Sequence, residues 1–398
     1  MSVKRKDNKG RILRDGEIQK ADGRYEFRYK DAGGTLRSLY SWRLTDADTV
    51  PNGKRKCDSL RELEKLALRD VQDGIAVTKA TLNDRWESYI SSKPELRKST
   101  VNDYYYMYNK FVRNDIGSLP ITSITYNRMK RFFNHLITDL GLKMTTVDNV
   151  NTVLHPVFTV AVRDNLIRTN PMTGLMSELK KAYNWSRPKR HSLTEEEQKI
   201  FMQRIDSSPL KPLFILMLGT GCRISEAVGL RWQDVLWEEN LISVNHILRY
   251  STIDGKARLW VGPPKTSCGT RMIPMMLSVR EALREEYKRQ EKEGFCSSVV
   301  DGYSGFIFCD KHGKAIRPET VNRAITALIK DCDVQHFSSH QLRHTFCTRF
   351  CERETDLKLI QEIMGHSDIS ITMDIYNESN IGRKKASFAR LETADIYH

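Results

Sequence analysis

The chain has 398 residues, too many for one ordinary hydrophobic core, so its length predicts two or three domains. Its 64 lysines and arginines against 50 acidic residues give a formal charge of +14, which favours a polyanionic partner, with nucleic acid the first candidate. The apolar run "LFILML" at 213–218 is far shorter than the roughly 20 residues that cross a bilayer, so a membrane protein is not expected.

Two further features bear on the compartment. The eight cysteines include no CxxC pair, which indicates reduced thiols rather than a disulfide framework. The N-terminal stretch "MSVKRKDNKGRILRDG" has the charges of a signal-peptide start but no apolar segment after them, so secretion is not expected. Both features favour the cytosol.

Residues 1–75 predict a small basic domain. At 23–44, "GRYEFRYKDAGGTLRSLYSWRL" alternates apolar with charged residues around Gly33-Gly34, which indicates a twisted antiparallel hairpin. A helix is predicted at about 59–73. Because a β-ribbon can enter the major groove of DNA, the candidate DNA-binding residues here are Lys4, Arg5, Lys6, Arg24, Arg28, Lys30 and Arg37.

Residues 80–183 have helical periodicity throughout and predict a bundle. Four helices are expected, within 81–92, 99–115, 124–141 and 144–165, the second of them with Ser99 as its N-cap. Basic residues lie among aromatic ones along these helices. These basic residues could equally belong to solvent-exposed helix faces or contact DNA. The candidates for DNA contacts are Lys98, Arg128 and Arg131.

A basic, proline-containing stretch, "KKAYNWSRPKRHSLTEEEQ", interrupts this pattern at 180–198. Thr194 and Glu197 have the spacing of a capping box that starts a new helix, so a domain boundary is expected near 183–192. Residues 190–398 then mix helices with a strand pair at about 241–274.

The segment "HQLRHTFCTRFC" at 340–351 predicts a helix with His340, Arg343 and His344 on one face. The two histidines have the spacing of a zinc-protease helix, but Gln341 stands where that helix carries its glutamate base. Arg343 would also oppose a metal dication, so no metal is predicted. The histidines could alternatively serve only as buried structural residues.

Two other segments of the C-terminal half place a cation beside a predicted turn or at a helix start. In "LGTGCRISEAVGLRWQDV", Arg223 follows a glycine turn at a helix start, where its planar fork of donors suits an anion, and Glu226 lies one turn on. In "GPPKTSCGTRMIP", Lys265 is expected at a hairpin, although a lysine there is more often merely solvated.

The segment "EIMGHSDISITMDIYNES" at 362–379 places His366 directly after a helix that Gly365 ends, and Tyr376 ten residues later. The set and order Arg223, Lys265, His340, Arg343, His366 and Tyr376 resembles the tyrosine recombinase family, the phage-type integrases. The similarity extends over nearly all of 190–380. The whole chain looks most like the integrases of conjugative transposons.

This resemblance implies a multi-domain α+β fold. Residues 1–75 would form an arm-type DNA-binding domain, a small β-sheet with one helix, and residues 80–183 a helical-bundle core-binding domain. Residues 190–398 would form the mixed α/β catalytic domain with a C-terminal tail helix. In that tail, Phe388, Leu391 and Ile396 suggest a narrow apolar stripe, which packs on its own domain or, as in the family, on a neighbouring protomer.

The resemblance also implies the reaction. Arg223 and Arg343 would clamp the phosphate, Lys265 would protonate the leaving oxygen, His340 would assist proton transfer and His366 would hydrogen-bond the phosphate. Tyr376 would be the nucleophile that forms a 3′-phosphotyrosine, and Glu226 would orient Arg223. Because the phosphotyrosine stores the bond energy, neither ATP nor any other cofactor is expected, and the chain contains no P-loop motif.

Two rounds of strand exchange through a four-way junction would give integration and excision of a mobile element. The expected partners are double-stranded DNA, at crossover and arm-type sites, and the protein itself, as a dimer to tetramer on DNA. An accessory excisionase or DNA-bending protein is a further expected partner, and the expected location is the bacterial cytoplasm, at the nucleoid. Two alternatives remain, a type IB topoisomerase-like enzyme and a DNA-binding relative that has lost the chemistry.

Overall fold

The computed structural model describes residues 5–187, 191–253, 256–370 and 372–373. The chain divides into two compact units, Met1–Arg187 and Pro188–His398. Lys4, Tyr376 and the whole predicted tail helix lie outside the described residues. In the described part of the chain, no helix is long and apolar enough to cross a membrane.

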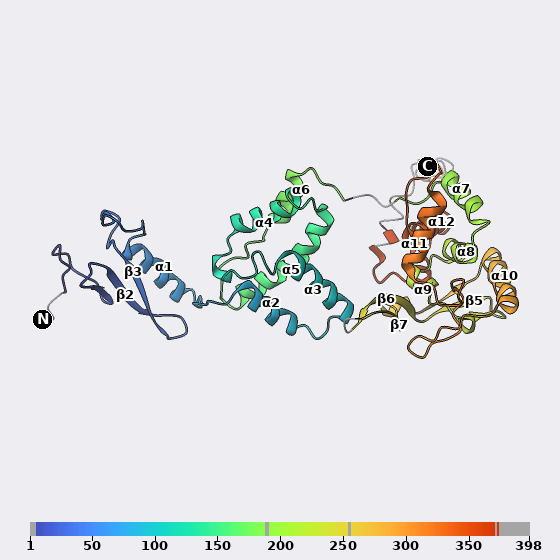
Figure 1. Ribbon diagram of the computed structural model, residues 1–398, viewed down its shortest axis with the longest axis horizontal. Coiled ribbons are helices and arrows are strands. Elements are labelled where there is room, and N and C mark those ends of the chain that lie inside the picture. The colour runs from blue at the N-terminus through green and yellow to red at the C-terminus, as the bar shows by residue number, and fades with distance from the viewer. Residues whose placement is uncertain (1–4, 188–190, 254–255, 371, 374–398) are drawn as a thin grey trace, which may run out of the picture. The chain divides into compact units, whose positions relative to one another are not determined.

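The first unit begins with a three-stranded antiparallel sheet and one helix (Figure 1). The strands pair in the order β1 (Glu17–Gln19), β2 (Tyr25–Lys30) and β3 (Leu36–Ser41), and α1 (Leu60–Gln72) packs on β2 and β3. Gly34, at the turn between β2 and β3, has a φ of 79°, a conformation that favours glycine. The predicted hairpin and helix are therefore confirmed.

A bundle of five helices follows in the same unit. Its helices are α2 (Leu82–Ser91), α3 (Lys98–Phe111), α4 (Tyr126–Thr138), α5 (Met144–Arg163) and α6 (Leu175–Ala182), with a short 3-10 turn at Ile121–Ser123. The four predicted helices are present, and α6 was not predicted because its eight residues are too few for a clear periodicity. The prediction of Ser99 as an N-cap is wrong. A turn at Lys93–Leu96 precedes the helix, and α3 begins at Lys98, before the predicted start. Arg97 is therefore the N-cap, and Ser99 lies in the first turn.

The second unit combines seven helices, counted over the described residues, with two small sheets. Its helices are α7 (Glu195–Ile205), α8 (Lys211–Thr220), α9 (Ile224–Ala227), α10 (Leu277–Glu293), α11 (Pro318–Ile329), α12 (Ser339–Arg353) and α13 (Leu357–Met364). Thr194 and Glu197 form the predicted capping box at the start of α7.

The region at 241–274, predicted as one strand pair, contains four strands that belong to two sheets. One sheet has the order β4 (Val235–Leu236), β5 (Leu241–Val244) and β8 (Arg271–Pro274), and the other is the hairpin of β6 (Ile247–Ile253) and β7 (Lys256–Gly262). Short 3-10 turns lie at Trp232–Asp234 and Ser267–Gly269. The loop between β7 and β8 thus connects separate sheets, which the alternating pattern alone could not reveal.

Two glycine helix ends bring the functional segments of this unit together. Helix α8 is buried against α10 and α12, and it ends at Gly221 with a φ of 63°. Helix α13 ends in the same way at Gly365, with a φ of 62°. Because glycine adopts this left-handed conformation without a Cβ clash, the chain turns sharply at both points. His366 directly follows Gly365, and Arg223 lies two residues after Gly221.

Candidate active site

Arg343 forms the buried centre of the candidate site. It lies on α12 with 3% of its surface exposed, and it donates hydrogen bonds of 2.7 Å from Nη1 to Gly221 O and from Nη2 to Met364 O. Both acceptors are carbonyls at helix C-termini, where the helix dipole favours a cation. Burial and the charge of Arg223 lower the pKa of Arg343 to about 9. This value is still above neutral pH, so the guanidinium stays protonated there.

Arg223 lies beside it at the N-terminus of α9. Its Nη1 donates to Glu226 Oε1 at 2.8 Å and its Nη2 donates to Gly365 O at 2.9 Å, while 34% of the side chain is exposed. Glu226 is buried, and burial alone would raise its pKa, but the nearby arginines lower the pKa and keep the group ionised. The carboxylate therefore holds Arg223 in place, the arrangement that an orienting role requires.

His366 completes the buried part of the site. Its Nδ1 lies 2.9 Å from Thr372 Oγ1, in a contact where either group can be the donor. Burial and the positive charges of Arg343 and Arg223, among others, lower the pKa of His366 to about 3. The imidazole is therefore neutral near pH 7.

Three residues of α12 that the sequence singles out, His340, Arg343 and His344, differ in their exposure to solvent. His340 is exposed in the first turn, and it is close enough to His366 to contribute to the lowering of its pKa. His344 is buried and its Nδ1 lies 3.5 Å from Thr348 Oγ1. The three residues lie on the predicted helix, and His340 is exposed there whereas Arg343 and His344 are buried. Within the part of the chain that the structure describes, no cluster of three or more His, Cys, Asp or Glu could hold a metal.

Lys265 lies in the loop between β7 and β8, with an exposed side chain. It is not in a hairpin as predicted, because these two strands belong to different sheets. The same loop nevertheless reaches the site. Gly269 O accepts a hydrogen bond of 3.0 Å from Arg271, and a Cβ on Gly365 would lie 2.9 Å from Cys268 O.

Sequence reasoning missed two residues of this site, Arg271 and Thr372. Arg271, on β8, donates to Glu226 and to two carbonyls, and Thr372 contacts His366. The only signal for Arg271 is a cation in the strand "RMIP", whose other residues are uncharged. Glu226 and Ile363, which Arg271 contacts, are remote in sequence, so a charged residue in this strand could not indicate which residues it would contact.

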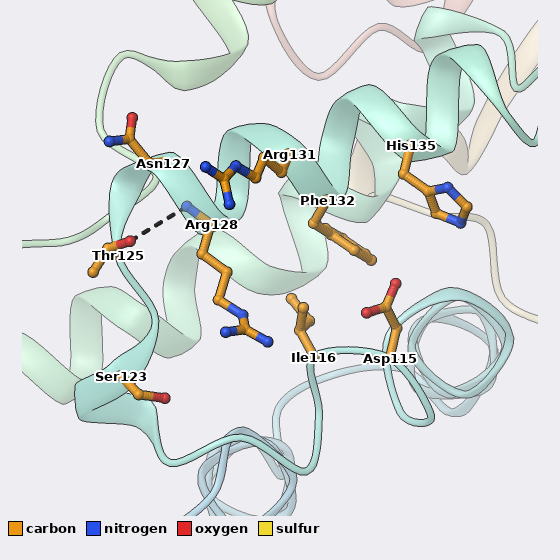
Figure 2. Close-up of a pocket in the computed structure, with 9 residues that line it drawn as sticks. All are labelled: Asp115, Ile116, Ser123, Thr125, Asn127, Arg128, Arg131, Phe132 and His135. Atoms are coloured by element: carbon orange, nitrogen blue, oxygen red, sulfur yellow. Dashed lines mark hydrogen bonds between the residues drawn. The ribbon is translucent and has the colours of Figure 1, made fainter. Parts of the chain in front are cut away.

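The bundle has a surface hollow of about 680 Å³ that contains two of the predicted DNA-binding residues, Arg128 and Arg131 (Figure 2). In Figure 2, Arg128 extends from the first turn of α4 toward Ile116, and Arg131 points toward Asn127. The third candidate, Lys98, is exposed at the start of α3. The hollow is also lined by Asp115 and His135, so its charge is mixed.

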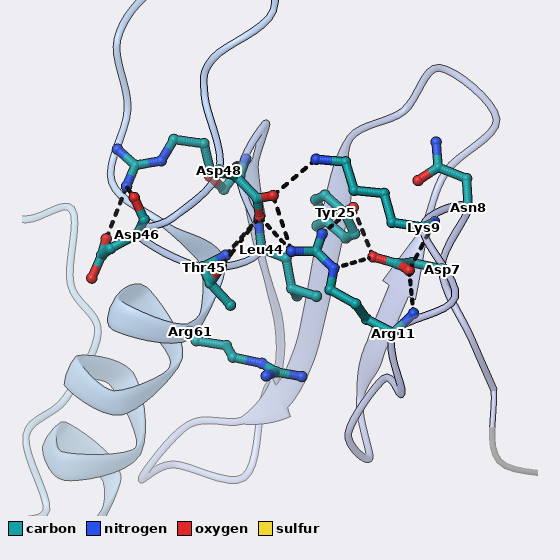
Figure 3. Close-up of polar contacts among 12 residues, drawn as sticks. Asp7, Asn8, Lys9, Arg11, Tyr25, Leu44, Thr45, Asp46, Asp48 and Arg61 are labelled. Atoms are coloured by element: carbon teal, nitrogen blue, oxygen red, sulfur yellow. Dashed lines mark hydrogen bonds and ion pairs between the residues drawn. The ribbon is translucent and has the colours of Figure 1, made fainter.

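Several cations of the N-terminal sheet are engaged in internal contacts. Lys9 and Arg11 both contact Asp48 at 2.9 Å, and Arg11 also contacts Asp7 and Tyr25, as Figure 3 shows. These contacts join the loop before β1 to the loop after β3. Lys9 and Arg11 are thus used to hold the domain together.

The predicted DNA-binding cations of this sheet differ in their partners. Arg28 pairs with Glu26, and Arg37 with Asp31. Arg24 pairs with Asp22 at 2.7 Å and also lies over the rings of Tyr40 and Trp42, 5.7 Å from each centroid. Exposed side chains are found for Arg5, Lys6, Arg24, Arg28 and Lys30.

Comparison with known proteins assigns the three regions separately. Residues 191–383 match the Phage integrase family, residues 81–180 the Phage integrase SAM-like domain, and residues 1–71 the DNA binding domain of tn916 integrase. The chain is 31% identical to the transposase from transposon Tn916 of Enterococcus faecalis, over 98% of this chain and 97% of that protein. It is equally similar to the transposase from transposon Tn1545 of Streptococcus pneumoniae.

Solved structures agree with these matches. The Tn1549 transposon integrase, determined in complex with a circular intermediate DNA, is 26% identical, with a TM-score of 0.69 over 78% of this chain and 99% of that one. Lambda integrase shares the fold at 20% identity, with a TM-score of 0.54. With a relative this similar over nearly its whole length, the chain belongs to the phage integrase family and is a tyrosine recombinase most like the integrases of conjugative transposons.

Proposed function

We propose that this site-specific recombinase integrates and excises a mobile element through a 3′-phosphotyrosine on Tyr376. The observation that carries the proposal is the convergence of Arg343 and Arg223 on the adjacent carbonyls of Met364 and Gly365. Two guanidiniums side by side suit the two non-bridging oxygens of one phosphodiester. The type IB topoisomerase-like alternative is not favoured, because the Tn916 and Tn1545 relatives are transposon proteins.

The charge of Arg343 is well suited to a phosphate. Among the residues that the structure describes, both of its hydrogen-bond acceptors are neutral carbonyls. A carboxylate partner would cancel much of the positive charge, whereas carbonyls at helix ends stabilise the cation and leave that charge for a ligand. Attack on the phosphorus concentrates negative charge on the non-bridging oxygens, so the arginines gain strength in the transition state.

The remaining residues take the roles that the family implies. Tyr376 attacks the phosphorus and the 5′-hydroxyl leaves, with Lys265 as the general acid and His340 assisting proton transfer. His366 hydrogen-bonds a phosphate oxygen. The 5′-hydroxyl of a second strand then attacks the phosphotyrosine, releases Tyr376 and restores the phosphodiester, so the reaction needs neither ATP nor a metal.

Thr372 sets which nitrogen of His366 carries the proton. If the Thr372 hydroxyl donates to Nδ1, then Nε2 carries the proton and can donate to the phosphate. Thr372→Val removes that donor, and we expect covalent complex formation to fall about fivefold, the value of one hydrogen bond of about 1 kcal/mol. Thr372→Ser, which keeps the hydroxyl, is the matched control. Equal rates in the two variants would contradict this role.

A nicked suicide duplex tests the function itself. The protein should form a covalent adduct with it in excess EDTA, and adding a second duplex should yield strands joined between the two. Adduct formation with relaxation of supercoils but no joined product would instead indicate a topoisomerase-like enzyme. DNA binding with no adduct at all would indicate a relative that has lost the chemistry.

We further propose three functional parts, an arm-binding domain at 1–75, a core-binding domain at 80–183 and a catalytic domain at 190–398. The protein would hold arm-type and crossover sites at the same time, as a dimer to tetramer on two duplexes. An excisionase or DNA-bending protein would assist, and the reaction would take place on the nucleoid in the bacterial cytoplasm. A tail docked on a neighbouring protomer would couple cleavage to assembly.

The arm-binding proposal makes its own prediction. A fragment of residues 1–75 should protect a DNA site distinct from the one protected by 80–398, and its affinity should fall steeply with salt through counterion release. Lys30→Ala, at the exposed end of β2, should weaken this binding. Lys65→Ala, an equal change of charge on the exposed side of α1, is the control. Coincident footprints for the two fragments would rule out two sites.

A further inference from the structure

Three consecutive carbonyls at the end of α13 each accept a hydrogen bond from a different arginine. Ile363 O accepts from Arg271 Nε at 2.7 Å, and the next two carbonyls accept from Arg343 and Arg223. The three arginines come from β8, from α12 and from the N-terminus of α9. The end of α13 is therefore a single platform for the two phosphate-clamping arginines and for a third one.

Arg271 also contacts the carboxylate that orients Arg223. Its Nη2 donates to Glu226 Oε2 at 3.0 Å, while Glu226 Oε1 accepts from Arg223 at 2.8 Å. The third nitrogen of the guanidinium, Nη1, donates to Gly269 O at 3.0 Å. All three nitrogens of Arg271 thus have acceptors within the protein.

The hydrogen bonds of Arg271, rather than its burial, separate it in function from the two clamping arginines. Arg343 is buried as well, with 3% of its surface exposed, but its two hydrogen bonds go to neutral carbonyls, whereas Arg271 donates from all three nitrogens and one of its acceptors is the Glu226 carboxylate. A guanidinium whose three nitrogens all have acceptors within the protein is poorly placed to hydrogen-bond DNA. Any influence of Arg271 on the reaction must therefore pass through the residues that it contacts.

We propose that Arg271 is a positioning residue for strand cleavage, which acts by sharing the Glu226 carboxylate with Arg223 and by fixing the end of α13. This inference rests on the proposed clamp of Arg223 and Arg343. With Arg271 present, Glu226 divides its charge between two guanidiniums, so Arg223 is held in place without being fully neutralised. Without it, the buried carboxylate pairs with Arg223 alone and draws that side chain away from the phosphate.

The backbone around the platform supports the same role. Gly365 has a left-handed φ of 62°, and a Cβ there would lie 3.0 Å from Arg271 Nη1 and 2.9 Å from Cys268 O. The guanidinium, the loop that carries Lys265 and the turn before His366 are therefore in close contact. Removing Arg271 should displace this turn and the two carbonyls next to it, to which Arg343 and Arg223 bind.

The test compares single and double variants on a suicide duplex at saturating DNA. Arg271→Met should slow covalent complex formation on the order of 10²-fold, the usual effect of a displacement of about 1 Å in a catalytic group, while DNA affinity stays within a few-fold. In a Glu226→Gln background, which already lacks the carboxylate charge, the same substitution should cost only about fivefold more. Arg271→Lys, which keeps a cation near Glu226, should restore part of the rate.

Arg280→Met is the matched control, because Arg280 is a partly buried arginine of α10 that donates to Trp237 O at 3.1 Å. It should leave the rate unchanged. A wild-type rate in Arg271→Met would overturn the role of Arg271. So would a double variant whose rate loss equals the product of the two single-variant losses. If Arg271→Met unfolds, the same comparison is made with Arg271→Lys, Glu226→Gln and the double variant that combines them. Failure of the wild-type protein to form an adduct would instead contradict the proposed function.

Discussion

Tyr376→Phe is expected to abolish covalent capture of DNA and to leave DNA affinity close to the wild-type value, because the substitution removes only a hydroxyl. Tyr376 follows His366 by ten residues, at the position of the family's last motif. The phenol is a poor nucleophile at its usual pKa near 10, so nearby cationic or proton-accepting groups must activate it. Denaturing gel electrophoresis of the suicide-duplex reaction measures the adduct, and a binding titration on the same DNA measures affinity.

Tyr397→Phe serves as the control for this variant, since Tyr397 also lies near the end of the chain. It should form the adduct at the wild-type rate. An adduct that persists in Tyr376→Phe and disappears in Tyr397→Phe would reassign the nucleophile.

Arg343→Lys should reduce cleavage by roughly 10³-fold or more, by analogy with a transition-state arginine, with a much smaller effect on DNA binding. The guanidinium of Arg343 bridges the ends of α8 and α13 through two separate nitrogens, and its planar fork of N–H donors suits a phosphate. A lysine keeps the charge, but its compact amine cannot reproduce this fork. Single-turnover cleavage at saturating DNA measures the loss, and Arg223→Lys should behave in the same way.

Arg349→Lys is a matched control on the same helix. Arg349 is partly exposed and pairs with Glu352 at 3.2 Å, so its replacement should leave cleavage unchanged. Cleavage within a few-fold of wild type in both Arg343→Lys and Arg223→Lys would contradict the arginine clamp.

The sequence predicts those parts of the fold that depend on local chemistry. Gly33 and Gly34 mark the turn of the N-terminal hairpin, and Thr194 with Glu197 marks the start of α7. The segments with a long helical period form the helices of the bundle. Ser99 shows the limit, because the turn before it, rather than its side chain, determines where α3 begins.

The candidate site is predictable only where its residues are close in sequence or match the family's pattern. The contacts of Arg271 to Glu226 and to Ile363 span 45 and 92 residues, and no local pattern reveals contacts at that range. Helical spacing likewise places His340 and His344 on one face of α12, but it does not reveal that packing buries His344 and leaves His340 exposed. The roles of all the candidate residues in DNA binding remain predictions, and three of them, Arg24, Arg28 and Arg37, pair with carboxylates of the domain.

The most direct test of the mechanism is to identify the protein residue that becomes joined to DNA. The adduct formed on a suicide duplex in excess EDTA is digested with protease and nuclease, and the nucleotide-bearing peptide is sequenced by mass spectrometry. The mechanism predicts one modified residue, Tyr376, joined to a 3′-phosphate, with a free 5′-hydroxyl on the other side of the cut. A modification on another residue, a 5′-phosphate linkage, or cleavage that occurs only with added metal would contradict it.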